Sequence, residues 1–213
     1  MEPIAVPLKS LALATAGVLC VEALARWAGA RIAVPALVLT AAARLLDLVW
    51  IGWVVHRFGP GARGLAVDRE RLRPGLRRGG LWSFAVGAAA AAGYLLLRGA
   101  GHDPAGLLFG GRAVRPSDPV LLFVVGGVLA PVVEEVFFRG LVFGWLRRWG
   151  FWPALCLSAA AFAALHPAAV PWTQLVGGLV FAAAYEIERN LWVPIVIHVL
   201  GNLALFSLPF VLG

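Results

Sequence analysis

Two adjacent glutamates and an arginine lie inside an otherwise apolar stretch of this sequence. Between residues 120 and 146 the only ionisable side chains are Glu134, Glu135 and Arg139. A charge near the centre of a bilayer costs at least about 2.5 to 3.5 kcal/mol on insertion scales, so ionisable residues in such a stretch are candidates for function. The chemistry that they offer is that of a carboxylate base supported by a cation.

The spacing of these three residues divides the two glutamates between two roles. In a helix, Glu135 and Arg139 are four residues apart and share one face, which favours an ion pair between them. Glu134 points about 100° away around the helix and is not committed to that pair. A carboxylate outside the ion pair suits a general base. The alternative hypothesis is that both glutamates only tie helices together.

Two later apolar stretches supply further polar side chains. Phe162-Ala-Ala-Leu-His166 ends in a histidine, and His198-Val-Leu-Gly-Asn202 places a histidine and an amide four residues apart. A single histidine near a helix end is usually a packing residue, but here two histidines, an amide and a carboxylate all lie in apolar segments. At a rise of about 1.5 Å per residue, Glu134, His166 and Asn202 reach comparable depths from one membrane surface. We expect them to meet inside the membrane, with His198 somewhat shallower.

These four side chains in a dry cavity admit two hydrolytic mechanisms. In the first, Glu134 with His166 deprotonates a water that attacks a peptide carbonyl, while His198 and Asn202 donate hydrogen bonds to the oxyanion. In the second, Glu134, His166 and His198 are the three protein ligands of a catalytic zinc whose bound water is the nucleophile. The sequence lacks HExxH, the usual local signature of such a zinc site. Both mechanisms predict hydrolysis, the first without a cofactor and the second with zinc.

Composition and hydropathy predict the helices that must position these residues. Of the 213 residues, 61% are hydrophobic and 14% are charged, and the mean hydropathy is +0.87, which is far more apolar than a soluble domain. The apolar stretches run over residues 4–25, 34–55, 81–97, 120–146, 151–165, 172–187 and 191–212. Since about 20 helical residues cross a bilayer, we predict an all-α, polytopic transmembrane bundle of about seven spans. It is a single integral-membrane domain over 1–213, with the catalytic motifs in 120–206 and the active site inside the membrane.

The net charge of +7 is best explained by the membrane surface, and we expect no nucleic-acid partner. The largest basic group lies in one segment between spans and comprises Arg57, Arg63, Arg69, Arg71, Arg73, Arg77 and Arg78, against Asp68 and Glu70. The positive-inside rule makes this segment cytoplasmic, and the N-terminus with it. We expect a multi-pass protein of a bacterial-type cytoplasmic membrane.

Other polar residues in the apolar stretches are expected to have structural roles. Arg44 and Asp47 lie three apart in the second span, which predicts a local ion pair that eases insertion into the membrane. Glu186 and Glu188 flank the turn before the last span, where we expect them to be solvated.

The three polar segments together resemble the motifs EExxxR, FxxxH and HxxxN of the CPBP family of intramembrane proteases, which includes type II CAAX prenyl proteases and Abi-like, bacteriocin-processing and immunity proteins. The matches are in order, on separate predicted helices. The resemblance implies a glutamate-dependent intramembrane endopeptidase without a metal. It also implies these roles: Glu134 is the catalytic glutamate working with His166, His198 and Asn202 complete the site, and Glu135 and Arg139 support it.

The resemblance also implies a protein or peptide substrate cleaved near membrane lipid. Substrate classes that fit are a C-terminal sorting tail, a leader-bearing peptide and a lipidated C-terminus. The chain is short beside the eukaryotic CAAX enzymes, so a prenylated substrate is not carried over. The alternatives are a catalytically silent membrane partner or immunity protein, the zinc-dependent intramembrane protease, and a transporter with a proton relay. A transporter would predict inverted repeats, and the sequence shows none.

Overall fold

The computed structural model describes residues 6–104, 118–166 and 172–211, and within these ranges the chain forms helices and turns without a strand. The predicted apolar stretches correspond to α1 (Leu8–Gly29), α2 (Ala36–Phe58), α4 (Leu72–Gly99), a composite helix over Pro119–Trp149, α9 (Phe151–Ala164), α10 (Trp172–Glu188) and α11 (Trp192–Val211). The short helices α3 (Gly61–Gly64) and η1 (Arg69–Arg71) join α2 to α4. The predicted all-α fold is confirmed.

The helix α4 begins well before the apolar stretch that was expected to form it. It starts at Leu72 and runs through the basic segment, with Pro74 in its first turn, where proline costs no helical hydrogen bond. Its first half packs closely on α11. A Cβ at Gly75 would lie 2.4 Å from the Cβ of Trp192, and one at Gly79 would lie 2.6 Å from that of Val196.

The helical segments differ in whether they are long enough to cross a membrane. Four helical segments of the described residues are long and apolar enough to span: Leu8–Gly29, Ala36–Phe58, Gly61–Gly99 and Pro119–Trp149. In contrast, α9 has 14 residues, which cover only about 21 Å of a hydrocarbon core of about 30 Å. The helix α9 starts two residues after Trp149, the end of the Pro119–Trp149 segment, and is too short to cross such a core on its own.

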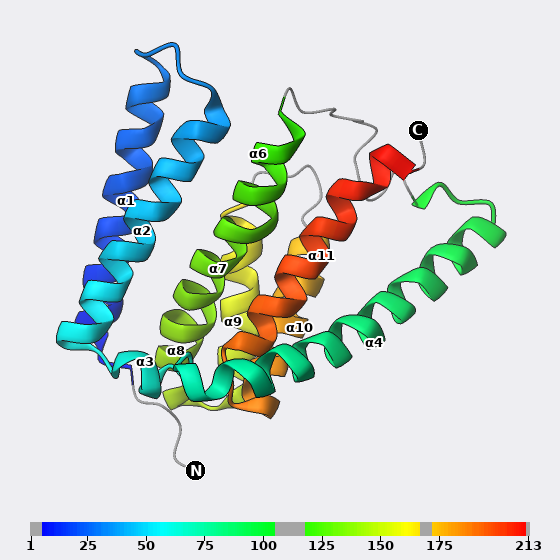
Figure 1. The fold of residues 1–213 in the computed structure, drawn as a ribbon. Helices are drawn as coiled ribbons and strands as arrows, with labels where there is room; N and C mark the ends of the chain where they lie inside the picture. Colours follow the sequence, from blue (N-terminus) through cyan, green and yellow to red (C-terminus); the bar gives the residue numbers. More distant parts are fainter. Residues whose placement is uncertain (1–5, 105–117, 167–171, 212–213) are drawn as a thin grey trace.

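In space, α1 and α2 form a hairpin beside the composite helix, with α9 and α10 behind it and α11 next to it (Figure 1). The helix α4 passes under α11 and then leans away from the bundle (Figure 1). Most of its residues after Phe84 are exposed. The composite helix is thus surrounded by the elements that carry the other candidate site residues.

The composite helix is not a regular α-helix. Its α-helical parts α6 (Pro119–Val124), α7 (Ala130–Glu135) and α8 (Gly144–Leu146) alternate with π-helical segments η2 (Val125–Leu129) and η3 (Val136–Phe143) and end in the 3-10 turn η4 (Arg147–Trp149). Pro131 in the first turn of α7 has no N–H to continue an α-helical ladder. Glu134 and Glu135 close α7 between two π segments, a feature that is frequent at functional sites.

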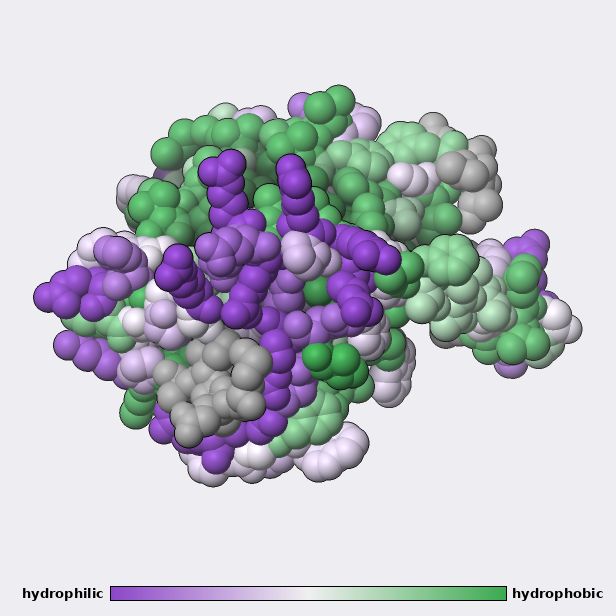
Figure 2. Space-filling model, turned by 60° about the horizontal axis from the view of Figure 1, so that its bottom comes forward, coloured by the Kyte–Doolittle hydropathy of each residue, from purple (hydrophilic) through white to green (hydrophobic). Residues whose placement is uncertain are grey.

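Many of the basic residues gather at one end of the molecule, on the face turned forward in Figure 2. We call this end the basic face; it comprises Arg57, Arg63, Arg69, Arg71, Arg73, Arg77, Arg78, Arg147, Arg148 and Arg189. Glu186 accepts two hydrogen bonds from Arg147, of 2.6 and 2.9 Å, and another from Arg189. Glu188 accepts a 2.9 Å hydrogen bond from Trp82 Nε1. The expectation that these two glutamates are solvated was wrong, because nearby donors hold both.

The ion pair predicted in the second span is present and extends to a second helix. Arg44 Nη1 lies 2.7 Å from Asp47 Oδ2, and Arg44 Nη2 also pairs with Glu22 of α1. The sequence spacing within α2 predicted only the local pair. The additional bond ties the α1–α2 hairpin together within the membrane.

Candidate active site

Three of the predicted site residues meet at the middle of the bundle. Glu134 at the end of α7 places its Oε2 3.8 Å from His166 Nε2 and 3.8 Å from His198 Nε2. Their side chains are 19%, 31% and 7% exposed, respectively. The site is therefore deep on the α11 side and more open next to His166.

Each histidine uses Nδ1 for a hydrogen bond and turns Nε2 towards Glu134. His166 Nδ1 lies 2.7 Å from the Phe162 carbonyl oxygen, which can only accept, so this nitrogen carries the hydrogen. His198 Nδ1 lies 2.7 Å from Oε1 of Glu135, a carboxylate paired with arginine. In a neutral ring that carries its hydrogen on Nδ1, Nε2 is an acceptor. When both rings are neutral, Glu134 Oε2 therefore faces one acceptor atom of each histidine.

A separation of 3.8 Å between acceptors leaves room for a shared proton donor. It exceeds a direct hydrogen bond, and a gap of this kind between polar atoms fits a bridging water. Such a water can donate one hydrogen to Glu134 and the other to a histidine. This is the arrangement in which a carboxylate can act as general base towards the water.

The predicted pair of Glu135 and Arg139 is present and fully buried. Their side chains are 0% exposed and Nη1 lies 3.0 Å from Oε1. Arg139 Nη2 also donates to the Gly178 carbonyl at 3.3 Å, and its guanidinium lies 4.6 Å from the Phe162 ring centre and 5.0 Å from that of Phe181. A desolvated ion pair is tolerated only with such additional partners. The pair thereby joins the composite helix to α9 and α10.

Two phenylalanines fix the rings of the histidines. Phe181 stacks on His198, with centroids 4.6 Å apart and planes at 21°. Phe162 meets His198 edge-on at 5.7 Å and lies 4.5 Å from the His166 ring. Sequence analysis gave Phe162 no role beyond its place in a motif and did not identify Phe181. No spacing marks Phe181, which is one of several aromatic residues in apolar helices.

Asn202 is placed differently from the expectation. It lies four residues after His198 on α11, but its Nδ2 donates a 2.9 Å hydrogen bond to the Gly126 carbonyl in η2. The close approach depends on glycine, because a Cβ at Gly127 would lie 2.6 Å from Leu203 Cδ2. The amide therefore ties α11 to the helix that carries Glu134. Only its second amide hydrogen remains for an oxyanion.

Glu134, His166 and His198 are also the residues that would bind a catalytic zinc. Among residues 6–104, 118–166 and 172–211, no group of three or more His, Cys, Asp or Glu side chains forms a metal-binding arrangement. Zinc ligands at about 2.0 to 2.2 Å from one ion lie roughly 3.3 to 3.6 Å apart, closer than the 3.8 Å between Glu134 and either histidine. A metal would require these three side chains to move together.

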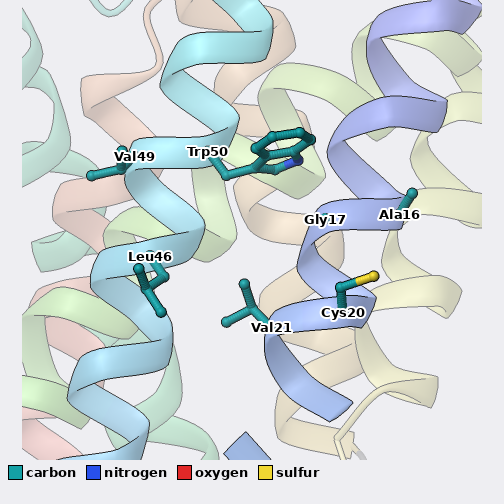
Figure 3. Close-up of a pocket in the computed structure, with 7 residues that line it drawn as sticks. All are labelled: Ala16, Gly17, Cys20, Val21, Leu46, Val49 and Trp50. Atoms are coloured by element: carbon teal, nitrogen blue, oxygen red, sulfur yellow. The ribbon is translucent and has the colours of Figure 1, made fainter. Parts of the chain in front are cut away.

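A separate apolar hollow lies between α1 and α2. It has a volume of about 490 Å³ and is lined by Ala16, Gly17, Cys20, Val21, Leu46, Val49 and Trp50 (Figure 3). Apart from the Cys20 thiol, the lining contains no side chain that could transfer a proton. This hollow is not part of the candidate site.

Comparison with known proteins supports the resemblance that the motifs suggested. Residues 116–204 match the sequence model of the family described as type II CAAX prenyl endopeptidase Rce1-like. The predicted resemblance is confirmed over this segment. It contains all six predicted site residues: Glu134, Glu135, Arg139, His166, His198 and Asn202.

Two curated bacterial proteins are similar to part of the chain. It is 30% identical over 86 residues to the Bacillus subtilis protein named "Putative membrane peptidase YdiL", covering 38% of this chain and 34% of that protein. It is 31% identical over 113 residues to the "Membrane-embedded CAAX protease MroQ" of Staphylococcus aureus, covering 45% of each. The chain thus spans less than half the length of these relatives. No solved structure matches it significantly.

Proposed function

We propose that this chain is a glutamate-dependent intramembrane endopeptidase that hydrolyses a peptide bond near the membrane. The observation that carries the proposal is the position of Glu134 Oε2, 3.8 Å from the Nε2 atoms of both His166 and His198. The match of residues 116–204 to an Rce1-like endopeptidase family supports it. The apolar helices around the site support a reaction within the membrane.

In the proposed reaction, Glu134 and His166 hold a water whose oxygen attacks the carbonyl carbon of the scissile bond. Glu134 takes the proton that the water loses, and the carbonyl becomes a tetrahedral oxyanion. When this intermediate collapses, the C–N bond breaks and Glu134 returns the proton to the leaving amine. The products are a carboxylic acid and an amine, which exchange a proton to become a carboxylate and an ammonium group, so that no other reactant is needed.

The oxyanion requires donors, and two groups on α11 can supply them. His198 can donate from Nε2 as an imidazolium, in which Nδ1 donates to the Glu135 carboxylate 2.7 Å away. Asn202 can donate its second amide hydrogen, since the first is used by the Gly126 carbonyl. Donors already held in place stabilise a developing oxyanion most effectively. We assign His198 and Asn202 to this role.

The substrate is a protein or peptide that presents its scissile bond at membrane depth. Candidate classes are a C-terminal sorting or lipidated segment and a leader-bearing peptide. The basic face is assigned to the cytoplasm by the positive-inside rule, which also makes the N-terminus cytoplasmic. We place the protein in a bacterial-type cytoplasmic membrane, in contact with lipid along its exposed apolar helices.

The proposal is tested by replacing the base without changing its size. Membranes from cells with the wild-type chain, with Glu134→Gln or with Glu70→Gln are compared for the termini of their membrane proteins and peptides. Glu70 is a suitable control because its side chain is 84% exposed on the basic face. We expect wild-type and Glu70→Gln cells to share cleaved termini that Glu134→Gln cells lack.

Purified protein then gives the size of the effect on a peptide spanning such a cleavage site. Loss of a general base lowers kcat by about 10² to 10⁴. Cleavage by Glu134→Gln at the wild-type rate would refute the mechanism. An absence of any terminus that depends on the chain would instead favour a catalytically silent membrane partner or immunity protein.

A further inference from the structure

The first turns of α4 surround a hollow on the basic face that the proposed reaction does not use. The hollow has a volume of about 320 Å³ and is lined by Arg73, Pro74, Arg77 and Arg78. All three arginines are exposed. Residues four apart on a helix are neighbours on one side of it, so the guanidinium groups of Arg73 and Arg77 extend from the same side.

The charge in this hollow is largely uncompensated. Within the described residues, neither Arg73 nor Arg77 forms an ion pair. Arg78 Nε lies 3.7 Å from Glu188 Oε2, but this carboxylate is outside the lining. An anion entering the hollow would therefore meet free guanidinium groups.

The hollow lies at the level of lipid headgroups. The basic turns of α4 pass into an apolar helix at Leu81 and Trp82. The indole N–H of Trp82 donates a 2.9 Å hydrogen bond to Glu188 Oε1. Tryptophan with a polar partner of this kind is common at membrane interfaces. With the apolar part of α4 in a bilayer, we expect these arginines at the plane of the phospholipid phosphates.

The base of the hollow is fixed to the turn between α10 and α11. Arg71 Nη1 donates to the Arg189 carbonyl at 2.8 Å, and Asn190 Nδ2 donates to the Arg71 carbonyl at 2.9 Å. Trp192 Nε1 adds a 3.1 Å hydrogen bond to the Asp68 carbonyl. The helix that presents the arginines is therefore held in place before any ligand arrives, which lowers the cost of ordering on binding.

We propose that this hollow binds the phosphate headgroup of an anionic phospholipid. Guanidinium groups match phosphate geometry and form charge-assisted, often bidentate, hydrogen bonds with it. The neighbouring apolar part of α4 offers a surface for the acyl chains of the same lipid. The site is independent of the proposed peptidase activity, because none of its residues contacts Glu134, His166 or His198.

The test measures lipid binding to the purified full chain in zwitterionic detergent. Phosphatidylglycerol is titrated and the first bound lipid is followed by native mass spectrometry for the wild type, Arg73→Gln/Arg77→Gln and Arg63→Gln/Arg69→Gln. The two double variants lose the same charge from the same face. We expect the first lipid to bind about tenfold or more weakly when the hollow is altered, and nearly normally in the control variant.

Equal weakening in both double variants would overturn the proposal, because it would show attraction to the basic face as a whole. Soluble glycerol phosphate is added as a competitor. If it displaces the bound lipid at a concentration similar to that at which the lipid itself binds, the ligand is a soluble phosphate and the proposal is overturned. If Arg73→Gln/Arg77→Gln fails to fold in a thermal unfolding assay, the single variant Arg77→Gln replaces it, with Arg63→Gln as control. An unchanged affinity in that single variant would refute the assignment.

Discussion

His198 Nδ1 lies 2.7 Å from Glu135 Oε1, and the same oxygen accepts a 3.0 Å hydrogen bond from Arg139. One buried oxygen atom therefore joins the ion pair of the composite helix to a histidine of α11. The neighbouring Glu134 faces the other nitrogen of that ring at 3.8 Å. Two glutamates adjacent in sequence thus face the two nitrogens of one imidazole, and only Glu135 is hydrogen-bonded to it.

Removing the arginine of the buried Glu135–Arg139 ion pair should strongly destabilise the protein. Arg139→Met leaves the Glu135 carboxylate buried without its partner, since both side chains are 0% exposed. Breaking a buried pair in this way costs about 3 to 5 kcal/mol. We expect a clear fall in the thermal unfolding temperature of the detergent-solubilised protein.

The double variant Glu135→Gln/Arg139→Met separates the two functions of the pair. Its amide oxygen can still accept from His198 Nδ1, but no charge remains unpaired, so much of the lost stability should return. Activity should remain low, because a neutral amide oxygen holds the His198 ring less firmly than a carboxylate does. A double variant with wild-type kcat would contradict the role given to Glu135.

Much of the fold could be predicted from the sequence because the membrane leaves few choices. Long apolar stretches must be helices there, and the spacing of Glu135 and Arg139 gave their pair directly. The start of α4 at Leu72 could not be predicted in this way, because that turn is basic and its helix is stabilised by packing on α11. Tertiary contacts decided this boundary.

Within the site, the limits of prediction have the same cause. Periodicity could indicate that Asn202 and His198 share a face, but not that the Asn202 amide is held by the Gly126 carbonyl. That contact depends on a π segment and on the approach of two helices, and neither leaves a pattern in the sequence. Phe181 acts through stacking across helices, which no local spacing records.

Replacing Phe181 should lower the rate of the reaction, although this side chain does not itself contact the proposed water. Phe181→Leu removes the ring that stacks on His198 at 4.6 Å, so that the imidazole can turn away from Glu134. Displacements of about 1 Å in a catalytic group can cost about 10²-fold in rate. We expect kcat to fall by roughly 10- to 100-fold with little change in KM.

The matched control for this variant is Phe84→Leu on α4, whose side chain is 79% exposed. It makes the same change of residue type away from the site and should leave both constants unaltered. A rise in KM at constant kcat for Phe181→Leu would show that the ring serves substrate binding instead of histidine orientation.

Metal removal distinguishes the two hydrolytic mechanisms. The glutamate-dependent mechanism predicts full activity after exhaustive treatment with a chelator, and no stoichiometric metal in the purified protein by elemental analysis. A zinc-dependent enzyme would lose activity under the chelator and regain it with added Zn²⁺. It would also lose zinc in His166→Ala and His198→Ala, because each ring would contribute one of three protein ligands.

Two adjacent glycines of α4 test how closely this helix must approach α11, which carries His198 and Asn202. A Cβ at Gly79 would lie 2.6 Å from Val196 Cβ and 3.1 Å from the Val193 carbonyl oxygen, whereas one at Gly80 meets nothing within 4 Å. We expect Gly79→Ala to destabilise the protein by about 1 to 3 kcal/mol through overpacking. Gly80→Ala should be neutral or stabilising by up to about 1 kcal/mol, since alanine favours the helix. Thermal unfolding of both variants checks this, and equal unfolding temperatures would show that α4 can move off α11 without cost.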